Sequence, residues 1–440
     1  MTVSGWGRYP VLNAQVNAPR DLAELQMRIA SGRAIARGNG RAYGDSAISE
    51  SNTISMRHFN HMCGFDDETG QLVAEAGVLL ADIIEAFLRR GWFPYVTPGT
   101  KFVTLGGMLA ADVHGKNHHK DGSFAEYVDW IDLVDPSGVV MRCSRSENAD
   151  LFGWTIGGMG LTGVILRAAI RLRPVESSWI RQRTLPASDL DHAIDLFETS
   201  LDATYSVAWI DCLQRGAGLG RSLVMLGEHA PVAELAPKQR AAPLAYSQKR
   251  KKSVPIDFPG WSLNRYSVQG FNKLYYWKGR RLRRETLVDW DSYFYPLDAI
   301  LGWNKIYGRR GLAQFQCAIP LAQSRDGMRA LIEAISAAGA GSFLSVLKRF
   351  GPQQSPFSFP MEGYTLSLDF PVNAQTLALM EQLDKITLSH GGRFYLAKDS
   401  RMSRETFIKS EPRLGQFIAQ RQKLRATQAF QSAQSERLGL

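Results

Sequence analysis

Three glycine-rich segments near the start of the chain carry its strongest chemical signal: residues 36–46, 98–107 and 157–163. A run of exposed backbone N–H groups can surround a phosphate, and a helix that begins with small residues can bring its N-terminus close to one. A single segment of this kind is more often a tight surface turn. Three of them in one region predict an extended ligand with phosphates at its middle.

The first segment does not match the common nucleotide-binding motifs. Gly38, Gly40 and Gly44 lack the G-x-G-x-x-G spacing, and no helical pattern follows them, which disfavours a Rossmann-type NAD site. No Walker A sequence occurs in the chain. Arg37 and Arg41 lie on either side of the first two glycines and add positive charge beside a bound anion.

Three histidines follow the second segment within six residues: His114, His118 and His119. Histidines so close together raise the possibility of a metal site. Two of them are adjacent, however, and no glutamate completes the H-E-x-x-H arrangement of zinc enzymes. The sequence therefore predicts no metal here and favours close packing of this region on a flat cofactor.

The elements predicted around these segments alternate between helices and strands, the pattern of a mixed α/β domain. Helices are predicted at 21–29, where Asp21 can act as the N-cap, at 79–91 and from Asn148 onward. Strands are predicted at 34–36, 53–57, 71–76, 130–134, 139–143 and 163–172. Beyond Pro174 the strand-like stretches become longer, at 206–211, 313–319 and 365–370, and predict a second domain.

The composition is that of a globular protein, with 440 residues, 45% of them hydrophobic, and a net charge of +10. The positive charge is concentrated in residues 238–284, which contain thirteen Lys and Arg, one acid (Asp257) and eight aromatic residues. This mixture suits single-stranded nucleic acid, a membrane interface with anionic lipid, or a solvated basic loop. The four cysteines lie far apart, so no disulfide framework is expected.

The N-terminal residues lack the basic and apolar regions of a signal peptide, and no stretch reaches the ~18 apolar residues of a spanning helix. We therefore expect a soluble protein, cytoplasmic or peripheral at the inner membrane, without excluding the periplasmic face.

The motifs resemble those of the vanillyl-alcohol oxidase superfamily, whose members bind FAD. The glycine-rich segments carry this resemblance, and four further motifs narrow it to the decaprenylphosphoryl-β-D-ribose 2′-oxidase family. These motifs are 114–119 (HGKNHH), 295–298 (YPLD), 348–352 (KRFGP) and 397–401 (AKDSR). The resemblance implies a two-domain α+β fold. Residues 1–177 form the FAD-binding domain, completed by 393–440, and residues 178–392 form a substrate domain with an antiparallel sheet and flanking helices.

The resemblance also implies which residues contact the flavin. These are Arg37, Gly38, Asn39, Gly40, Arg41, Ala42, Tyr43, Gly44, Asp45, Ser46, Gly99, Thr104, Leu105, Gly106, Gly107, His114, Gly115, Lys116, Asn117, Ile165 and Tyr395. Many superfamily members carry a histidine after the second glycine of the first segment and bind the flavin covalently through it. Arg41 stands there in this chain, so we expect FAD to be dissociable.

Lys398 is the catalytic residue that the resemblance indicates, as the base or polarising group beside the ring, with Tyr43, His114 and Lys116 as its neighbours. The alternative is a surface lysine paired with Asp399. The expected substrate-binding residues are Gln314, Gln316, Lys348, Ser367 and Lys398. Ser367 stands where mycobacterial relatives have a cysteine, so inhibitors that react with that thiol are not expected to trap this protein.

The expected activity is FAD-dependent oxidation of the 2′-hydroxyl of polyprenyl-phosphoryl-β-D-ribose to a ketone. This is the first half of an epimerisation to the arabinose donor for cell-wall or glycoconjugate synthesis. The pathway partner is then an NAD(P)H-dependent short-chain reductase. A lipid-linked substrate favours membrane contact over nucleic acid for residues 238–284. The alternatives are an aldonolactone or alditol oxidase of a soluble sugar and, in another class, a basic aromatic nucleic-acid-binding protein.

Overall fold

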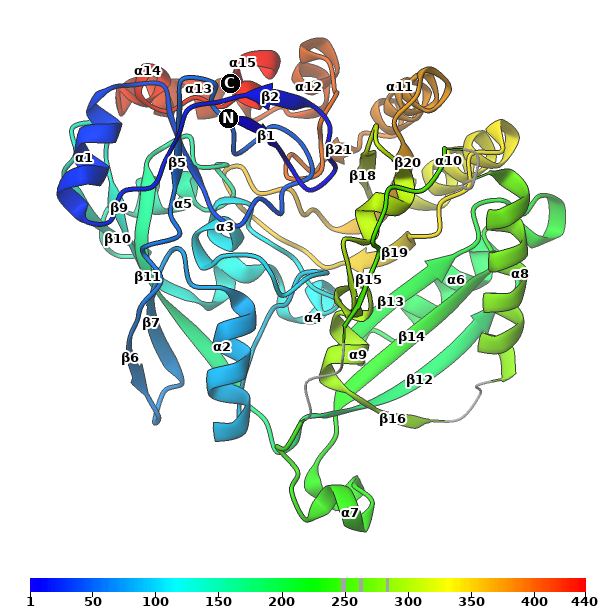
Figure 1. Ribbon diagram of the computed structural model, residues 1–440. Coiled ribbons are helices and arrows are strands. Elements are labelled where there is room, and N and C mark those ends of the chain that lie inside the picture. Colours follow the sequence, from blue (N-terminus) through cyan, green and yellow to red (C-terminus); the bar gives the residue numbers. More distant parts are fainter. Residues whose placement is uncertain (247–250, 261–263, 282–284) are drawn as a thin grey trace.

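The computed structural model describes residues 1–246, 251–260, 264–281 and 285–440. Parts of the basic segment 238–284, including Lys249, Arg250 and Trp261, therefore lie outside the described residues. Figure 1 shows the N-terminal elements and a large sheet side by side, with the C-terminal helices beside the N-terminal strands.

The chain begins with two small sheets. The first is the hairpin β1 (Thr2–Ser4) and β2 (Val11–Asn13), and the second is parallel, in the order β3 (Val16–Asn17), β5 (Asn52–Ser55) and β4 (Ala34–Arg37). Helix α1 (Leu22–Ala30) begins at the predicted cap, where the Asp21 carboxylate accepts a hydrogen bond from the Glu24 N–H. The first glycine-rich segment directly follows β4 and forms turns instead of a helix.

An antiparallel sheet of six strands forms the centre of the N-terminal part. Its order is β10 (Val140–Ser144), β9 (Val128–Val134), β11 (Val164–Pro174), β7 (Gln71–Glu75) and β6 (Met62–Asp66), and β8 (Trp92–Pro94) pairs with the end of β11. The helices of this part are α2 (Leu80–Phe87), α3 (Leu105–Ala110), α4 (His118–Asp121) and α5 (Ala149–Thr155). The apolar positions predicted for 79–91 are buried against this sheet, which confirms the helical spacing.

The large sheet has eight antiparallel strands. Its order is β16 (Thr286–Asp289), β12 (Trp179–Ala187), β14 (Ser222–His229), β13 (Tyr205–Ile210), β19 (Ser345–Phe350), β20 (Gly363–Pro371), β18 (Leu312–Pro320) and β21 (Arg393–Phe394). Helices α6 (Leu190–Glu198), α10 (Ser324–Ala338) and α11 (Ala374–Ser389) pack on one face and form its core. Successive side chains of a strand point to opposite faces of the sheet, so every second residue of these strands points to the face that the three helices do not cover.

Helix α8 (Arg265–Arg281) packs on that opposite face, over β12 and β14. Around it lie α7 (Pro237–Arg240), α9 (Trp290–Phe294) and the parallel pair β15 (Lys252–Ser253) and β17 (Ile300–Leu301). Short 3₁₀ turns occur at Leu88–Arg90, Phe124–Tyr127, Gly216–Gly218, Val232–Glu234, Pro296–Ala299, Trp303–Tyr307 and Leu321–Gln323. Within the described ranges, no helix combines the length and apolar character needed to cross a bilayer.

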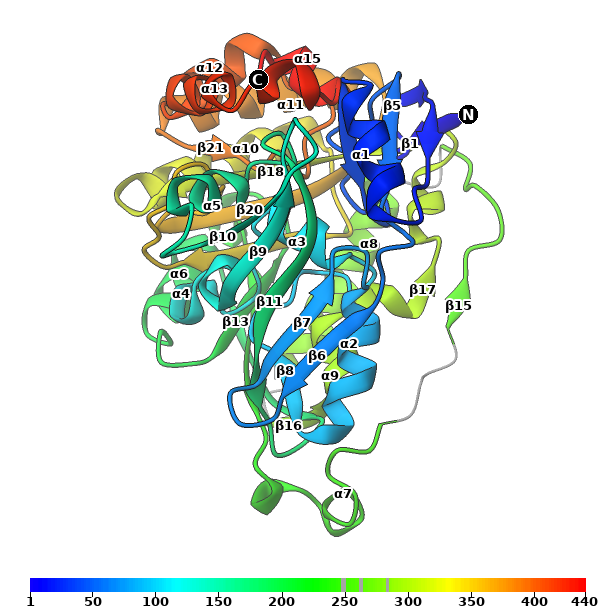
Figure 2. The same cartoon turned by 90° about the vertical axis from the view of Figure 1, so that its left-hand side faces the viewer.

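The C-terminal helices return to the N-terminal part (Figure 2). They are α12 (Arg404–Ser410), α13 (Leu414–Lys423), α14 (Ala426–Ala429) and α15 (Ala433–Leu438). Backbone hydrogen bonds fix this return, from the Gln431 N–H to the Ala34 carbonyl (2.9 Å) and from the Ala433 N–H to the Ile48 carbonyl (2.8 Å). The expected bounds at 177 and 392 stay a prediction, and β21 shows that residues just after 392 also join the large sheet.

Arg437 bridges two buried carboxylates at this junction. Its Nη2 lies 2.8 Å from both Asp45 Oδ1 and Asp399 Oδ2. We expect Arg437→Leu to lower the free energy of unfolding by about 3 kcal/mol, because it leaves both carboxylates buried without their cation. Urea denaturation followed by circular dichroism measures this loss.

The matched control is Arg33→Leu, which removes the exposed ion pair with Glu436 and is expected to cost less than about 1 kcal/mol. Equal losses for the two variants would show that the Arg437 bridge does not stabilise the junction.

Candidate active site

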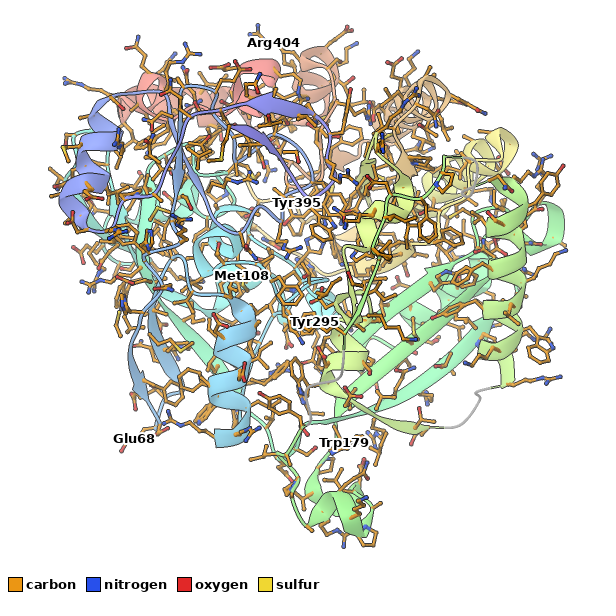
Figure 3. The ribbon with its side chains drawn as sticks, viewed as in Figure 1. Glu68, Met108, Trp179, Tyr295, Tyr395 and Arg404 are labelled. Carbon is orange, nitrogen blue, oxygen red and sulfur yellow. The ribbon has the colours of Figure 1, made fainter. Side chains whose placement is uncertain are left out.

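A cavity of about 540 Å³ lies between the N-terminal part and the large sheet. Its walls include parts of all three glycine-rich segments, the residues Tyr395, Ala397 and Lys398, and the face of the large sheet that α6, α10 and α11 leave free. Figure 3 labels Tyr395 and Tyr295, which lie between the two halves of the molecule. The three segments that the sequence indicated are therefore brought together at one site.

The first two glycine-rich segments touch each other at Gly38. A Cβ atom at this position would overlap the hydroxyl oxygen of Thr104, so only glycine allows this approach. Thr104 is the N-cap of α3, and its hydroxyl accepts a hydrogen bond from the Gly107 N–H (3.3 Å). Gly99 faces open space, with no atom within 4 Å of the position of a Cβ. The N-terminus of α3 and the turn at 38–41 thus border the same space.

The third segment continues this wall. The Gly157 and Met159 N–H groups donate to the carbonyls of Leu109 and Ala110, at 3.0 and 2.8 Å, and hold the loop against α3. Gly157, Met159 and Gly160 all have positive φ angles, of 78°, 56° and 75°. Met159, Gly160 and Gly163 of this loop line the cavity.

Five residues expected to contact the flavin do not line the cavity: Arg37, Gly44, Asp45, Leu105 and Asn117. Each is engaged with protein groups behind the wall. The Arg37 guanidinium donates to the Ser4 carbonyl (2.8 Å), and the Asn117 amide donates to the Tyr95 carbonyl (2.8 Å). The Asp45 carboxylate accepts a hydrogen bond from Arg437, and Leu105 is buried in the core. These residues support the wall instead of forming it.

The remaining expected residues do line the cavity. They are Gly38, Asn39, Gly40, Arg41, Ala42, Tyr43, Ser46, Gly99, Thr104, Gly106, Gly107, His114, Gly115, Lys116, Ile165 and Tyr395, together with Gln314, Gln316, Lys348, Ser367 and Lys398. The structure therefore gathers most of the residues expected to contact the flavin, and all of those expected to contact the substrate, around one space.

Arg41 occupies the position where many superfamily members have a flavin-linked histidine. Its guanidinium carbon lies 4.3 Å from the centre of the Trp6 ring and 5.2 Å from that of Phe102. Its Nε is buried and has no hydrogen-bond partner among the described residues. The sequence did not indicate these two rings: Trp6 lies outside the three glycine-rich segments, and Phe102 lies in the second one but is not one of its glycines.

Lys398 lies deep in the cavity, above the ring of Tyr43. Its Nζ is 3.9 Å from the ring centre. Burial lowers the pKa of Lys398 to about 8, although the nearby Asp369 opposes this shift. The alternative of a surface pair with Asp399 is wrong, because Asp399 is buried and pairs with Arg437.

Asp369 is a buried carboxylate beside Lys398 that sequence reasoning missed. It lies on β20 opposite Gln314 of β18, whose amide donates a hydrogen bond to it. Burial raises the pKa of Asp369 to about 7, while the Gln314 hydrogen bond and Lys398 oppose the rise. The sequence did contain a signal for Asp369. Ser367 and Asp369 are two residues apart on β20, so their side chains share one face of the sheet with Gln314 and Gln316.

Two further lysines face the same cavity. Burial lowers the pKa of Lys116 to about 7, and its ammonium donates to the Tyr293 carbonyl. Burial also lowers the pKa of Lys348 to about 7, helped by repulsion from Lys398 and Lys116. Three ammonium groups in one enclosed space repel one another, and a bound anion relieves both the repulsion and the lost hydration.

The three neighbouring histidines have separate partners. The Nε2 atom of His114 lies 3.1 Å from the Gln316 amide, that of His118 lies 2.6 Å from Gln353 Oε1, and that of His119 lies 2.8 Å from the Ala203 carbonyl. Burial lowers the pKa of His114 well below its usual range, so its ring is neutral at pH 7. Within the described residues, no three His, Cys, Asp or Glu side chains gather as metal ligands would.

Comparison with known proteins explains this arrangement. An FAD-binding domain family matches residues 15–144. The chain is 35% identical, over 99% of its length and 97% of the relative's, to decaprenylphosphoryl-β-D-ribose oxidase of Mycolicibacterium smegmatis. The chain belongs to the decaprenylphosphoryl-β-D-ribose oxidase family.

Two other known proteins are also similar to the chain. An uncharacterised protein of Streptomyces coelicolor is 34% identical over 82% of this chain and 100% of that protein. L-gulonolactone oxidase of Bos taurus is 29% identical over 37% of this chain and 36% of that enzyme. The protein is an FAD-dependent oxidoreductase with the expected two-part α+β fold.

The cavity fits FAD as its cofactor. The close contact of Gly38 with the N-cap of α3 leaves backbone N–H groups around one space, where they can bind the pyrophosphate. Arg41 also lines this cavity, so its guanidinium adds positive charge for the same anion. The loop at Met159 and Gly160 lines the same cavity, where its backbone can lie against a planar ring.

We expect the flavin to be released when the protein is precipitated with acid. Arg41 cannot form the covalent bond that a histidine forms at this position. The absorbance of the supernatant and of the resuspended pellet measures the partition. Yellow colour that remains with the pellet would contradict the prediction.

We expect Gly38→Ala to lose most of its bound flavin, because the added methyl group would displace Thr104 and open the contact with α3. The flavin to protein absorbance ratio is the measurement. Gly64→Ala is the matched control, since its Cβ would meet no atom within 4 Å. An unchanged ratio in Gly38→Ala would show that this contact does not hold the cofactor.

Proposed function

We propose that this oxidoreductase acts on the 2′-hydroxyl of a polyprenyl-phosphoryl-β-D-ribose and oxidises it to a ketone. The observation that carries the proposal is the order of side chains across the large sheet. Strand register gives the row Gln316, Ser367, Val346 and Trp209 on the cavity face, from β18 to β13. The wall thus changes from polar to apolar along its length.

The polar end suits a sugar. Gln314 and Gln316 are 4% and 5% exposed, so their amides are held inside the protein beside the cavity. Buried amide groups that face a ligand discriminate strongly, because they lose hydrogen bonds when a substrate hydroxyl is missing. Gln314 is already oriented by Asp369, and Gln316 by Thr365 (3.3 Å).

The cationic centre suits the phosphate. Lys116 and Lys348 are both enclosed. Burial lowers the pKa of Lys348, and repulsion from the nearby Lys116 adds to this shift. A phosphodiester carries one negative charge at all physiological pH values and stabilises the protonated lysines. The apolar end, at Val346 and Trp209, then suits the first part of a hydrocarbon chain.

Lys398 is the group that we assign to the hydroxyl proton. Bound FAD accepts the hydride when an alcohol is oxidised to a ketone. The neutral amine of Lys398 accepts the hydroxyl proton, and its pKa of about 8 leaves part of it neutral at pH 7. The Tyr43 ring below Lys398 and the neutral His114 also line the cavity, and neither carries a competing negative charge.

The ketone product requires a second enzyme. Reduction from the opposite face of the sugar ring gives arabinose, and an NAD(P)H-dependent short-chain reductase is the partner that supplies this hydride. The pair would make the arabinose donor for cell-wall or glycoconjugate synthesis. The name of the mycobacterial relative supports this substrate, and the similarity to that relative covers 99% of the chain.

A soluble sugar substrate is the second candidate. The similarity to L-gulonolactone oxidase supports it, but covers about a third of the chain. A small hydrophilic substrate would leave the apolar end of the cavity unused. The lipid-linked sugar therefore accounts for more of the lining.

We expect kcat to rise between pH 6 and 9 with an apparent pKa near 8, because Lys398 must lose its proton before it can act as a base. KM should rise above pH 7, since Lys116 and Lys348 lose positive charge there. Lys398→Met should lower kcat by about 10²-fold or more and remove the rise with pH. The exposed Lys409→Met is the control. A flat pH profile for the native protein would contradict the role of Lys398.

Anaerobic flavin bleaching tests the substrate. Farnesylphosphoryl-β-D-ribose, a short-chain form of the proposed substrate, is expected to bleach the flavin band near 450 nm within seconds, on the order of typical kcat values. Free ribose and L-gulonolactone should leave it oxidised. Bleaching by L-gulonolactone alone would support the second candidate and overturn the first.

A further inference from the structure

Helix α8 has a buried face that fixes it on the large sheet. Gly279 lies directly on Leu223 of β14, where a Cβ would overlap the leucine side chain. The Asn272 amide donates to Asp211 (2.7 Å), and the Tyr276 hydroxyl donates to the Ala187 carbonyl (3.0 Å). These contacts set the rotation of the helix and determine which residues point outward.

The outward face of α8 is apolar at its centre. Tyr266, Leu274 and Trp277 are 82%, 64% and 51% exposed. They are separated by eight and three residues, so they share one side of the helix. A soluble surface rarely exposes three large apolar side chains in such a row, and a patch of this kind marks an interaction surface.

Cations surround these apolar residues. Lys273, Lys278, Arg280 and Arg281 are exposed on the same helix, and the Arg281 guanidinium lies 3.7 Å above the Trp277 ring. Among residues 251–281, the acid in the described part is Asp257, which pairs with Arg8. The surface is therefore positive and complements an anionic partner.

The same helix borders the apolar end of the cavity. Tyr275 lines the cavity, and its ring packs 4.8 Å from that of Trp209. Val207 and Met225, opposite each other on β13 and β14, continue the apolar lining. One element thus separates an outward apolar face from an inward apolar wall.

We propose that the outward face of α8 docks on an anionic phospholipid bilayer, and that a prenyl chain passes from the bilayer to the apolar wall at Trp209 and Met225. A helix with aromatic and cationic residues on one side lies in the headgroup region, where rings meet acyl chains and cations meet anionic lipid. The prenyl part of this inference rests on the proposed function, whereas the bilayer contact does not.

Vesicle sedimentation of the flavin-loaded protein tests the bilayer contact. We expect binding to vesicles of phosphatidylcholine with phosphatidylglycerol, and at least about tenfold weaker binding to phosphatidylcholine alone. The double variant Leu274→Ser with Trp277→Ser should lose at least about fivefold in binding and keep its flavin.

The matched control is Ile408→Ser, a similarly exposed apolar residue on α12, at 50% exposure, which should bind as the native protein does. Equal binding by the native protein and the double variant would overturn the proposal. So would equal binding to both vesicle types, or tighter binding of the α8 surface to single-stranded DNA than to the anionic vesicles.

Protection from heat tests the prenyl wall. Farnesyl phosphate should raise the melting temperature of the flavin-loaded protein more than inorganic phosphate does, and Met225→Gln should weaken farnesyl phosphate binding by about fivefold. Equal effects of the two ligands would overturn the prenyl site. A third outcome separates the two proposals. If the protein binds vesicles and farnesyl phosphate but the ribose substrate does not bleach the flavin, the proposed function is wrong and the lipid-binding surface is still supported.

Discussion

The contact between residues 42–45 and 397–399 determines the site. The Tyr43 N–H donates to the Ala397 carbonyl (2.9 Å), and Gly44 lies so close to the Asp399 carbonyl that a Cβ would overlap it. Arg437 then joins Asp45 to Asp399. Backbone contacts on both sides of Lys398 thus fix this side chain over the Tyr43 ring. Segments more than 350 residues apart in the sequence thus form the proposed base and the ring below it.

The enclosed cavity removes its lysines from water, which disfavours their charged form, and the proposed chemistry depends on this effect. Lysines removed from water favour their neutral form, and this is what gives Lys398 a pKa of about 8. Asp369 opposes the shift and keeps the pKa from falling further, so the amine stays basic enough to accept a proton. Lys116 and Lys348 share the same enclosure, and an anionic substrate restores their charge. In the proposed function, proton transfer and phosphate recognition therefore both depend on the removal of lysines from water.

Local pattern was enough to predict much of the fold. Helical spacing predicted α2, and the Asp21 cap predicted α1. Alternation predicted β11, and longer strand-like stretches predicted β18 and β20, all within a few residues. The convergence of three glycine-rich segments on one cavity also followed from the sequence. These features depend on neighbours within a few positions, where spacing carries the information.

Features formed by distant residues could not be predicted in this way. Asp369 reaches the site because strand pairing sets it opposite Gln314. Trp6 and Phe102 reach it because both of their rings contact the Arg41 guanidinium. Asn117 was expected at the flavin, but its amide is used by Tyr95 and Asp121. The basic segment was recognised by composition, yet the outward row on α8 appears only when Gly279 fixes the rotation of the helix.

The pKa of the Lys398 amine is the most direct test of this account. Nitrogen-15 NMR of the flavin-loaded protein can follow the lysine side-chain signals with pH, and Lys398→Met identifies the signal. The account predicts a midpoint near 8, which falls when Asp369 is replaced by Asn because the opposing carboxylate is lost. A midpoint at the ordinary lysine value of about 10.4, unchanged by that replacement, would contradict it.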